Sequence, residues 1–377
     1  MTLILKLASR NLFQDRLRFV ATVIGVVFSI VLVIVQLGLF LSFTRMVTTM
    51  IDHAPADLWI VPYGTKCFED PSLLDLHDRS LALAVGGVTD AVPIVVGFAQ
   101  WSVPTGGTTP VFLVGSNRTP PGLAPWNLVD GTVDVLSTAR TVAVDQTYFG
   151  RLGITAVGDS TEIRDQKVEV GAITRGIRSF TTTPYLFTSL SQAQAYMGLS
   201  SNRASYLLVH LSPDTDIADV RAALLAKLPK VEVLTPDEFR SRSRSFWLFG
   251  TGAGAALFAG ALLGVIVGTV IVAQTLYSST KDHLNEFATL RAIGSSGAYI
   301  HMVIVAQALL SAAIGFTLAA SLGLVIVALT GETALPIMMT PALTFGLFLL
   351  TVLMCVISAL CAIVQVTRID PARVFKP

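Results

Sequence analysis

Residues that could carry out chemistry are few and scattered along this chain. The five histidines lie far apart and show none of the spacings typical of a metal site: His53, His77, His210, His283 and His301. Ser212 and Asp214 closely follow His210, but alternation along the end of a strand explains this spacing better than a catalytic triad does. The cysteines form no disulfide framework or ligand set: Cys67, Cys355 and Cys361. The sequence therefore predicts no catalytic residue, no metal site and no cofactor.

Nucleotide and ion chemistry are also missing from the chain. The loop G-x-x-x-x-G-K-[ST], which holds the phosphates of ATP in Walker-type ATPases, does not occur. The long apolar runs contain almost no ionisable side chain, and their polar candidates are Gln36, Gln274 and Gln307. Ion and proton carriers usually need ionisable groups at mid-membrane, so the sequence argues against a secondary transporter. A formal net charge of +1 argues against binding nucleic acid through bulk electrostatics.

One polar interval, residues 277–299, separates the second and third apolar runs. A helical i, i+3, i+4, i+7 spacing gives one face of a short helix a mostly apolar character: Leu284, Phe287, Ala288 and Arg291. Gly294 then stands where a left-handed C-cap favours glycine. Such a helix can lie on the membrane surface as a connector or dock into a groove on a soluble partner. The pattern alone leaves both uses open.

The elements around this interval are those of an integral membrane α-helical protein. The chain is 53% hydrophobic and only 14% charged, with a mean hydropathy of +0.68. We expect four transmembrane helices and a large α+β extracytoplasmic domain between the first and second spans. The expected division is an N-terminal amphipathic helix (1–16), the first span (17–44), the α+β domain (45–245), the second span (246–276, with a stalk from 236), the polar loop (277–299), the third span (300–329), a short loop (330–341), the fourth span (342–366) and a tail (367–377).

The α+β domain is expected to mix strands and helices along the chain. Its strand candidates are residues 57–62, 92–103, 110–115, 167–174 and 205–211. Its helix candidates are residues 72–84, 190–197 and 217–228. The string Trp59-Ile-Val-Pro62 is expected to form an edge strand.

A stalk helix is predicted to lead from this domain into the second span. Thr235-Pro-Asp-Glu238 is a capping box with proline at the first helical position. No break in the helical pattern is evident from there to about Leu276, apart from glycines that membrane helices tolerate. Roughly 40 residues at about 1.5 Å each give roughly 60 Å, about twice the hydrocarbon thickness. We therefore expect one long helix that could carry movement rigidly.

Within the second span, Gly260, Gly264 and Gly268 recur at every fourth position. Small residues at this spacing let two helix backbones approach closely. The helix they contact could belong to the same chain or to a second copy in a homodimer, and the sequence leaves both open.

Basic residues predict the orientation of the spans. They lie in the N-terminal segment, in the 277–299 loop and in the tail: Lys6, Arg10, Arg16, Arg18, Lys281, Arg291, Arg368, Arg373 and Lys376. The 330–341 loop contains none. Both termini and the polar loop are therefore expected on the cytoplasmic side, with the α+β domain outside.

Three stretches of this chain resemble a known family of membrane proteins. Glu286-Phe-Ala-Thr-Leu-Arg-Ala-Ile-Gly-Ser295 resembles the E-x-x-x-L-(K/R)-A-(I/L)-G signature of FtsX/MacB-type (type VII) ABC transporter permeases. Leu7 to Arg18 resembles the N-terminal A-x-R-N-L-x-x-x-(K/R)-x-R helix of that family, and Val366 to Lys376 resembles its R-x-x-P-x-x-x-L-(K/R) tail. The middle segment looks most like the DevC branch of exporters.

The resemblance implies a role for the polar loop and a set of partners. In the family this loop is the coupling helix that sits on the ATPase, which here implies a coupling role for Glu286, Phe287, Leu290, Arg291, Ile293 and Gly294. Two copies of the chain would pair with two ATPase subunits in a bacterial inner membrane. ATP-driven movement would pass to the outer domain, which would take a substrate from the periplasm or the outer leaflet.

Two functions are compatible with the resemblance. The DevC branch implies export of a hydrophobic or lipid-like molecule with a periplasmic membrane-fusion adaptor and an outer-membrane channel; haem is a further candidate substrate, although no His or Tyr pair marks a haem site. Alternatively, an FtsX-like regulator would activate an outer partner, such as a cell-wall hydrolase, without transporting anything. The membrane helices serve both uses equally, so the partners must discriminate between them.

Overall fold

The computed structural model describes residues 2–14, 16–70, 72–117, 122–282, 289 and 295–367. The chain divides into two compact units. The membrane unit comprises Met1–Leu41, Ala255–Gly331 and Pro336–Pro377. The inserted domain comprises Ser42–Gly254 together with the short segment Glu332–Leu335.

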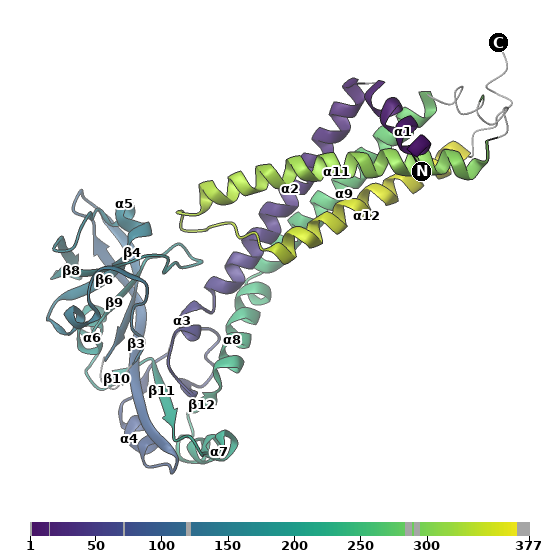
Figure 1. Ribbon diagram of the computed structural model, residues 1–377. Helices are drawn as coiled ribbons and strands as arrows, with labels where there is room; N and C mark the ends of the chain where they lie inside the picture. The colour runs from purple at the N-terminus through teal and green to yellow at the C-terminus, as the bar shows by residue number, and fades with distance from the viewer. Residues whose placement is uncertain are drawn as a thin grey trace. The chain divides into compact units, whose positions relative to one another are not determined.

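Long helices build the membrane unit (Figure 1). They are α1 (Thr2–Gln14), α2 (Arg16–Met46), α9 (Ala253–Asp282), α11 (Gly297–Thr330) and α12 (Pro341–Thr367). Within the described residues, four segments are long and apolar enough to cross a membrane: Phe19–Met46, Ala253–Ser278, Gly297–Thr330 and Pro341–Cys361. The predicted architecture of four spans, with a domain between the first and the second, is confirmed.

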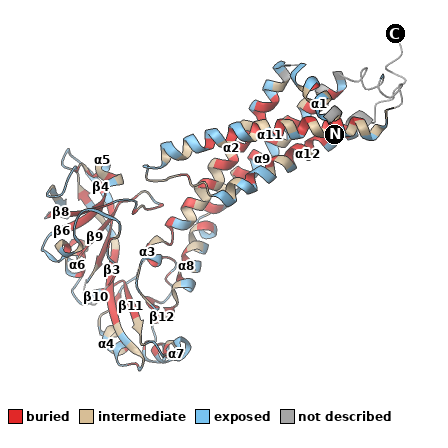
Figure 2. Ribbon diagram, viewed as in Figure 1, coloured by how far each residue is buried: buried red, intermediate tan, exposed pale blue. Residues whose placement is uncertain are grey.

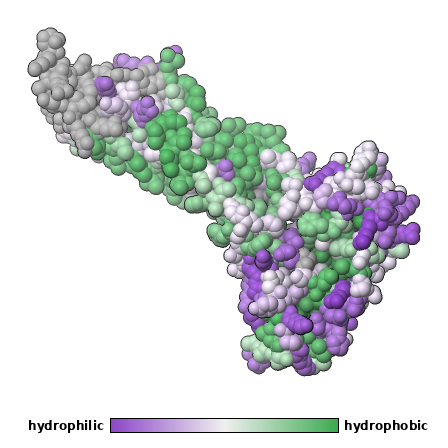
Figure 3. Space-filling view, turned by 180° about the vertical axis from the view of Figure 1, so that it is seen from behind, coloured by the Kyte–Doolittle hydropathy of each residue, from purple (hydrophilic) through white to green (hydrophobic). Residues whose placement is uncertain are grey.

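The membrane unit buries small and branched side chains in its interior. Ile30 and Ile34 of α2 pack in one cluster with Ala312 of α11 and Ala359 of α12. Larger apolar side chains point outward, and hydrophobic surface gathers over these helices (Figure 3). An apolar surface of this extent on a soluble protein would be a liability, whereas lipid can cover it.

The inserted domain is organised around a large, mostly antiparallel sheet. Among the described residues the sheet has ten strands in the order β12-β1-β11-β3-β4-β9-β6-β8-β5, with β7 pairing β3 and β8. The strands are β1 (Leu58–Pro62), β3 (Val88–Ser102), β4 (Thr108–Ser116), β5 (Leu128–Gly131), β6 (Thr141–Asp145), β7 (Ser160–Ile163), β8 (Gln166–Thr174), β9 (Tyr185–Thr188), β11 (Tyr206–Leu211) and β12 (Val231–Leu234). β2 (Leu74–Asp75) and β10 (Arg203–Ala204) form a separate pair. The β4–β9 and β6–β8 pairs are parallel.

Short helices complete the inserted domain, and buried residues follow its strands (Figure 2). The helices are α3 (Thr49–Asp52), α4 (His77–Leu83), α5 (Phe149–Leu152), α6 (Leu190–Met197), α7 (Ile217–Lys227) and α8 (Pro236–Ser245), with 3-10 turns η1 (Val133–Ser137) and η2 (Gln146–Tyr148) and a π-helix η3 (Phe246–Gly250). Ala82 of α4 and Leu224 of α7 pack in one cluster with strand residues such as Leu58. A second, aromatic-rich cluster contains Trp59 and Phe239. The predicted α+β class is confirmed.

The expectation of an edge strand at Trp59-Ile-Val-Pro62 is wrong. β1 pairs with β11 through Leu58–Ile60 and with β12 through Trp59–Pro62. All five of its residues are buried. Pro62 is tolerated because it is the last residue of the strand, where the loss of one backbone donor disturbs the ladder least.

The stalk begins as predicted, but it is not one continuous helix. Thr235 and Glu238 form the reciprocal capping box at the start of α8. The helix then widens into η3, where Thr251 N–H donates to the Phe246 carbonyl at 3.0 Å. Gly252 follows with φ of 76°, a left-handed conformation that ends helical hydrogen bonding before α9 begins. The predicted unbroken helix through to the second span is therefore wrong, because a π turn and a left-handed glycine interrupt it.

Candidate functional site

The residues predicted to couple the chain to an ATPase lie outside the described part of the structure: Glu286, Phe287, Leu290, Arg291, Ile293 and Gly294. The helices on either side are described. α9 ends at Asp282 and α11 begins at Gly297. Ser296 caps α11, its hydroxyl accepting a hydrogen bond of 3.3 Å from Tyr299 N–H. The coupling role of the loop stays a prediction.

The three glycines of the second span face α2 of the same chain. A Cβ built on Gly260 would lie 2.6 Å from Gln36 Nε2, and one on Gly264 would lie 3.0 Å from Val33 Cγ2. A Cβ on Gly268 would collide with the Ser29 side chain. Ser29 Oγ also donates a short hydrogen bond to the Gly264 carbonyl oxygen. Residues 260, 264 and 268 thus form a close intrachain contact, which we call the glycine seam.

Arginines of the stalk helix α8 fasten it to other parts of the inserted domain. Arg240 Nε forms an ion pair of 2.6 Å with Asp52 Oδ1 of α3. Arg244 Nη2 lies 3.5 Å from Thr48 Oγ1, in the turn that precedes α3. The stalk is therefore joined to the segment that follows the first span.

A further arginine joins the stalk to the sheet. Arg242 Nη2 forms an ion pair of 2.6 Å with Glu232 Oε2 of β12, and its Nη1 donates to the Thr65 carbonyl at 3.1 Å. Glu232 also accepts a hydrogen bond of 2.9 Å from Gly64 N–H. The hydrogen bond from Arg242 is the main cause that lowers the pKa of Glu232 below its ordinary value.

A small aromatic cluster gathers the ends of several segments within the inserted domain. Phe180 packs edge-on against Trp247 of η3, with ring centroids 4.6 Å apart, and against Phe43 near the end of α2, at 5.1 Å. Leu335, from the loop between α11 and α12, packs against the same cluster. The chain segments that lead to three spans therefore contribute side chains to one cluster. We call it the junction cluster, defined by Phe43, Met46, Val47, Phe180, Trp247 and Leu335.

Glu69 is a buried carboxyl group beside this cluster. Glu69 as a whole residue is only 8% exposed. Tyr185 Oη donates to Glu69 Oε1 at 3.2 Å, and Trp247 Nε1 donates to Oε2 at 3.0 Å. Both donors are neutral, and no cation forms an ion pair with Glu69 among the described residues. Burial raises the pKa of this carboxyl to about 7, with the two hydrogen bonds opposing the shift.

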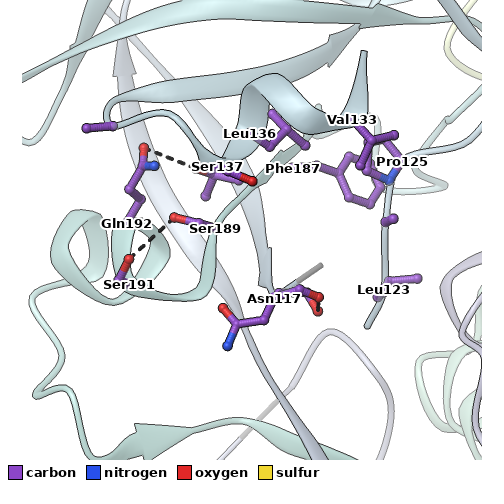
Figure 4. A pocket seen from close by; sticks show the side chains of 14 residues that line it. Asn117, Leu123, Pro125, Val133, Leu136, Ser137, Phe187, Ser189, Ser191 and Gln192 are labelled. Carbon is purple, nitrogen blue, oxygen red and sulfur yellow. Dashed lines mark hydrogen bonds between the residues drawn. The ribbon is translucent and has the colours of Figure 1, made fainter. Parts of the chain in front are cut away.

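A cavity of about 350 Å³ lies elsewhere in the inserted domain (Figure 4). Apolar side chains form one side, including Leu123, Val133, Leu136 and Phe187, while the other carries amide and hydroxyl groups of Asn117, Ser137, Ser189, Ser191 and Gln192. No charged side chain belongs to the described lining. Its size lies at the low end for small-molecule sites, and its chemistry suits an uncharged ligand.

Sequence reasoning singled out neither Glu69 nor Trp247. The hydrogen bond between them spans 178 residues, and no local spacing indicates it. The local signal was only a pair of consecutive acidic residues, Glu69 and Asp70, directly after the apolar pair Cys67-Phe. Such a string is equally typical of a loop in which the carboxylate is solvated.

Comparison with known proteins identifies the family. Residues 19–227 match the family model of the MacB-like periplasmic core domain, and residues 248–371 match that of the FtsX-like permease C-terminal. The first match alone covers more than half of the 377-residue chain. No curated protein matches the chain.

Solved structures give weaker likenesses to parts of this chain. The periplasmic region of MacB from Actinobacillus actinomycetemcomitans has a TM-score of 0.39 and 12% identity, covering 51% of this chain and 94% of that one. The extracellular domain of YknZ from Gram-positive bacteria has a TM-score of 0.36 and 17% identity, covering 48% and 99%. A domain of a putative permease from Porphyromonas gingivalis has a TM-score of 0.34 and 13% identity, covering 50% and 91%. The assignment rests on the family models rather than on these likenesses.

The regions that the two family models match agree with the two parts of the architecture described above. The FtsX-like permease match spans the region that contains α9, α11 and α12, and the MacB-like core match spans most of the inserted domain. Four apolar helices within such a family indicate a multi-pass protein of the inner membrane. The chain belongs to the MacB/FtsX-type family of ABC transporter permeases, in which a separate ATPase subunit hydrolyses ATP.

Proposed function

We propose that this permease transmits mechanical work from an ATPase to the inserted domain, which then acts on a hydrophobic or lipid-like substrate outside the membrane. The observation that carries the proposal is the glycine seam. It packs α9 closely against α2, the two helices that border the inserted domain in sequence. Two helices in such contact can move as one body, so movement applied at the cytoplasmic end of α9 would reach both of them.

The chemistry of the spans supports this mode over passage through the membrane. Within the described spans, the buried polar side chains are hydroxyls and one amide, Gln307, and several hydroxyls bond to carbonyls within their own helix. A pathway for a charged solute needs polar groups directed into a water-filled space. The described spans therefore offer no path for a charged solute, and the proposed route collects a hydrophobic substrate outside them, from the outer leaflet or the periplasm.

The proposed orientation puts both termini and the 277–299 loop in the cytoplasm. It rests on the basic residues of these segments and on their absence from residues 331–340. Single cysteines introduced at Lys281 and Glu332 in a variant without native cysteines test it by labelling with a membrane-impermeant maleimide in spheroplasts. Labelling at 332 and not at 281 is expected, and the reverse pattern would invert the topology.

The complete machine is proposed to contain two copies of this chain, two ATPase subunits and a membrane-fusion adaptor, with an outer-membrane channel as in the DevC branch. The glycine seam is occupied by α2, so a homodimer would use another surface. Crosslinking in the native membrane, gentle solubilisation and identification of the co-purified proteins test this composition. An ATPase with an anchored adaptor supports export. An ATPase with a wall-active hydrolase supports the FtsX-like regulatory alternative, and no ATPase removes the proposal.

A disulfide across the seam tests rigid transmission. A Cβ on Gly260 would lie 3.2 Å from Gln36 Cγ, so cysteines at positions 36 and 260 should be within bonding reach. If α2 and α9 move as one body, the oxidised double variant Gln36→Cys/Gly260→Cys keeps the ATPase activity and function of its reduced form. Loss of turnover on oxidation, restored by reductant, would mean that the helices slide past each other instead. The two single-cysteine variants are the controls.

A further inference from the structure

The feature with the most unexplained chemistry is the carboxyl of Glu69. It is held by two neutral donors from distant segments, Tyr185 of β9 and Trp247 of η3. A buried carboxyl without a nearby cation is costly when ionised, because nothing replaces its lost hydration. Trp247 belongs to a π-helix, a rare conformation that frequently marks functional sites. The carboxyl thus bonds directly to the irregular segment that leads into α9.

Glu69 is the buried group of its neighbourhood that changes charge near neutral pH. Cys67 is buried on the same loop, and burial raises the pKa of its thiol to about 12. Burial also raises the pKa values of Tyr185 on β9 and Tyr206 on β11 well above the ordinary value. Lys66 and Asp70 are exposed on the same loop, with Lys66 Nζ 5.9 Å from the Phe246 ring centroid of η3. Among the described residues, Lys66 forms no ion pair with Glu69, and Asp70 is itself an acid and cannot balance its charge.

The two donors respond differently when Glu69 gains a proton. The indole N–H of Trp247 can only donate, so Oε2 must stay an acceptor in both protonation states. The hydroxyl of Tyr185 can donate or accept, so a proton on Oε1 can be donated to Tyr185 Oη. Ser179 lies against Tyr185 and can take part in this rearrangement. A protonated Glu69 therefore satisfies both neighbours without a buried charge.

We propose that Glu69 is a positioning residue that works as a proton-sensitive latch: its protonated carboxyl holds Trp247 and the π-helix η3 packed in the inserted domain, and its ionisation favours their release. Glu69, Tyr185 and Trp247 all belong to the inserted domain, and η3 directly follows the stalk helix α8. It holds for an exporter and for a regulator alike, and so goes beyond the proposed function.

The size of the effect follows from linkage between protonation and packing. The pKa of Glu69 is about 7 in the packed arrangement, against 4.5 for an ordinary glutamate. A released, solvated carboxyl ionises with the ordinary value, so protons favour the packed arrangement. Between full protonation and full ionisation, the equilibrium shifts toward release by up to about 300-fold. The shift occurs between about pH 4.5 and 7 and is complete above that range.

Hydrogen–deuterium exchange of the full-length chain in nanodiscs tests the latch. Protection factors of peptides covering residues 246–252, corrected for the intrinsic rate at each pH, are measured from about pH 5 to pH 8.5. We expect wild-type protection to fall by about 75-fold over this range, because part of the full shift of about 300-fold has already occurred at about pH 5. In Glu69→Gln the amide oxygen can accept from Trp247 and the amide N–H can donate to Tyr185. This variant should stay protected at every pH.

Two further variants make the outcome decisive. Trp247→Phe keeps an aromatic ring but removes the donor that favours the ionised carboxylate. The midpoint of the pH-dependent fall in protection should therefore move to higher pH. Glu162→Gln makes the same chemical change at an exposed carboxyl of β7 and should keep the wild-type profile. Protection that does not vary with pH in the wild type, or variation that survives in Glu69→Gln, overturns the proposal. If Glu69→Gln fails to fold, an unmoved midpoint in Trp247→Phe overturns it equally.

Discussion

Ser29 donates its hydroxyl hydrogen bond to the carbonyl oxygen of Gly264, which lies 235 residues further along the chain. The bond joins α2 to α9. It forms because neither Gly264 nor Gly268 places a side chain between the two backbones. Membrane helices gain little from the hydrophobic effect between them, so close packing and such bonds carry their association. A single methyl group in the seam should therefore matter more than one on a lipid-facing surface.

Gly268→Ala should destabilise the chain, whereas Gly346→Ala should not. A Cβ at position 268 collides with Ser29 and comes within 2.9 Å of Met354 Sδ, while one at position 346 meets nothing within 4 Å. Overpacking typically costs about 1–3 kcal/mol, whereas Gly to Ala in an open helix position gains about 0.5–1 kcal/mol. Thermal unfolding in detergent, followed by circular dichroism, compares the two. Equal melting temperatures of Gly268→Ala and Gly346→Ala would show that the packing at the glycine seam adjusts to an extra methyl group without loss of stability.

Glu286→Arg and Gly294→Pro should each uncouple the chain from its ATPase. The first reverses a charge in the predicted docking helix, and the second replaces the residue expected to end that helix. ATPase binding should weaken by about tenfold or more, as for other reversed interface charges. Glu332→Arg, in the loop between α11 and α12, makes the same charge change and should bind normally. The affinity of the ATPase for each detergent-solubilised variant measures the effect, and the melting temperature of each variant checks its folding. Normal ATPase binding and normal function in both Glu286→Arg and Gly294→Pro would exclude the coupling role.

The architecture of four spans and an inserted α+β domain could be predicted because long signals carry it. The apolar runs are longer than the apolar stretches of helices in soluble proteins. The capping box at Thr235 marks the start of the stalk locally. The long strands β3 and β4 were also recognisable, although their ends were not. Short strands such as β6 and β9 were missed, since four or five residues give too little alternation and only their pairing in the sheet defines them.

The candidate sites were predictable only in part. The spacing of Gly260, Gly264 and Gly268 indicated a close helix contact, but nothing local identified α2 as the helix that they face. The break at η3 depends on the left-handed conformation of Gly252, one of many glycines in an apolar context where continuation was the simpler expectation. Glu69 could not be recognised, because its burial arises from Tyr185 and Trp247, which are remote in sequence.

Arg242→Met should lower stability at neutral pH and make it less sensitive to acid. Arg242 lowers the pKa of Glu232 below its ordinary value of 4.5, so the pair contributes stability above that pH and loses it as the pH falls through the lower folded value. Both side chains are partly exposed, which limits the contribution to about 0.5–1 kcal/mol. Denaturant unfolding at pH 7 and at pH 3.5 measures the difference. The exposed arginine at 203 supplies the control, Arg203→Met, which should keep the wild-type acid sensitivity.

Thiol labelling should distinguish the three cysteines by burial. Cys67 and Cys355 are buried, and Cys361 is exposed. Burial raises the pKa of Cys67 to about 12, so almost none of it is the reactive thiolate at pH 6.5. In detergent at this pH the folded wild type should take up one maleimide per chain, Cys361→Ser should take up none, and both should label fully after denaturation. Mass spectrometry of the intact chain gives the count. Rapid labelling of Cys67 in folded Cys361→Ser would mean that its loop opens readily, and the same opening would expose Glu69 to water.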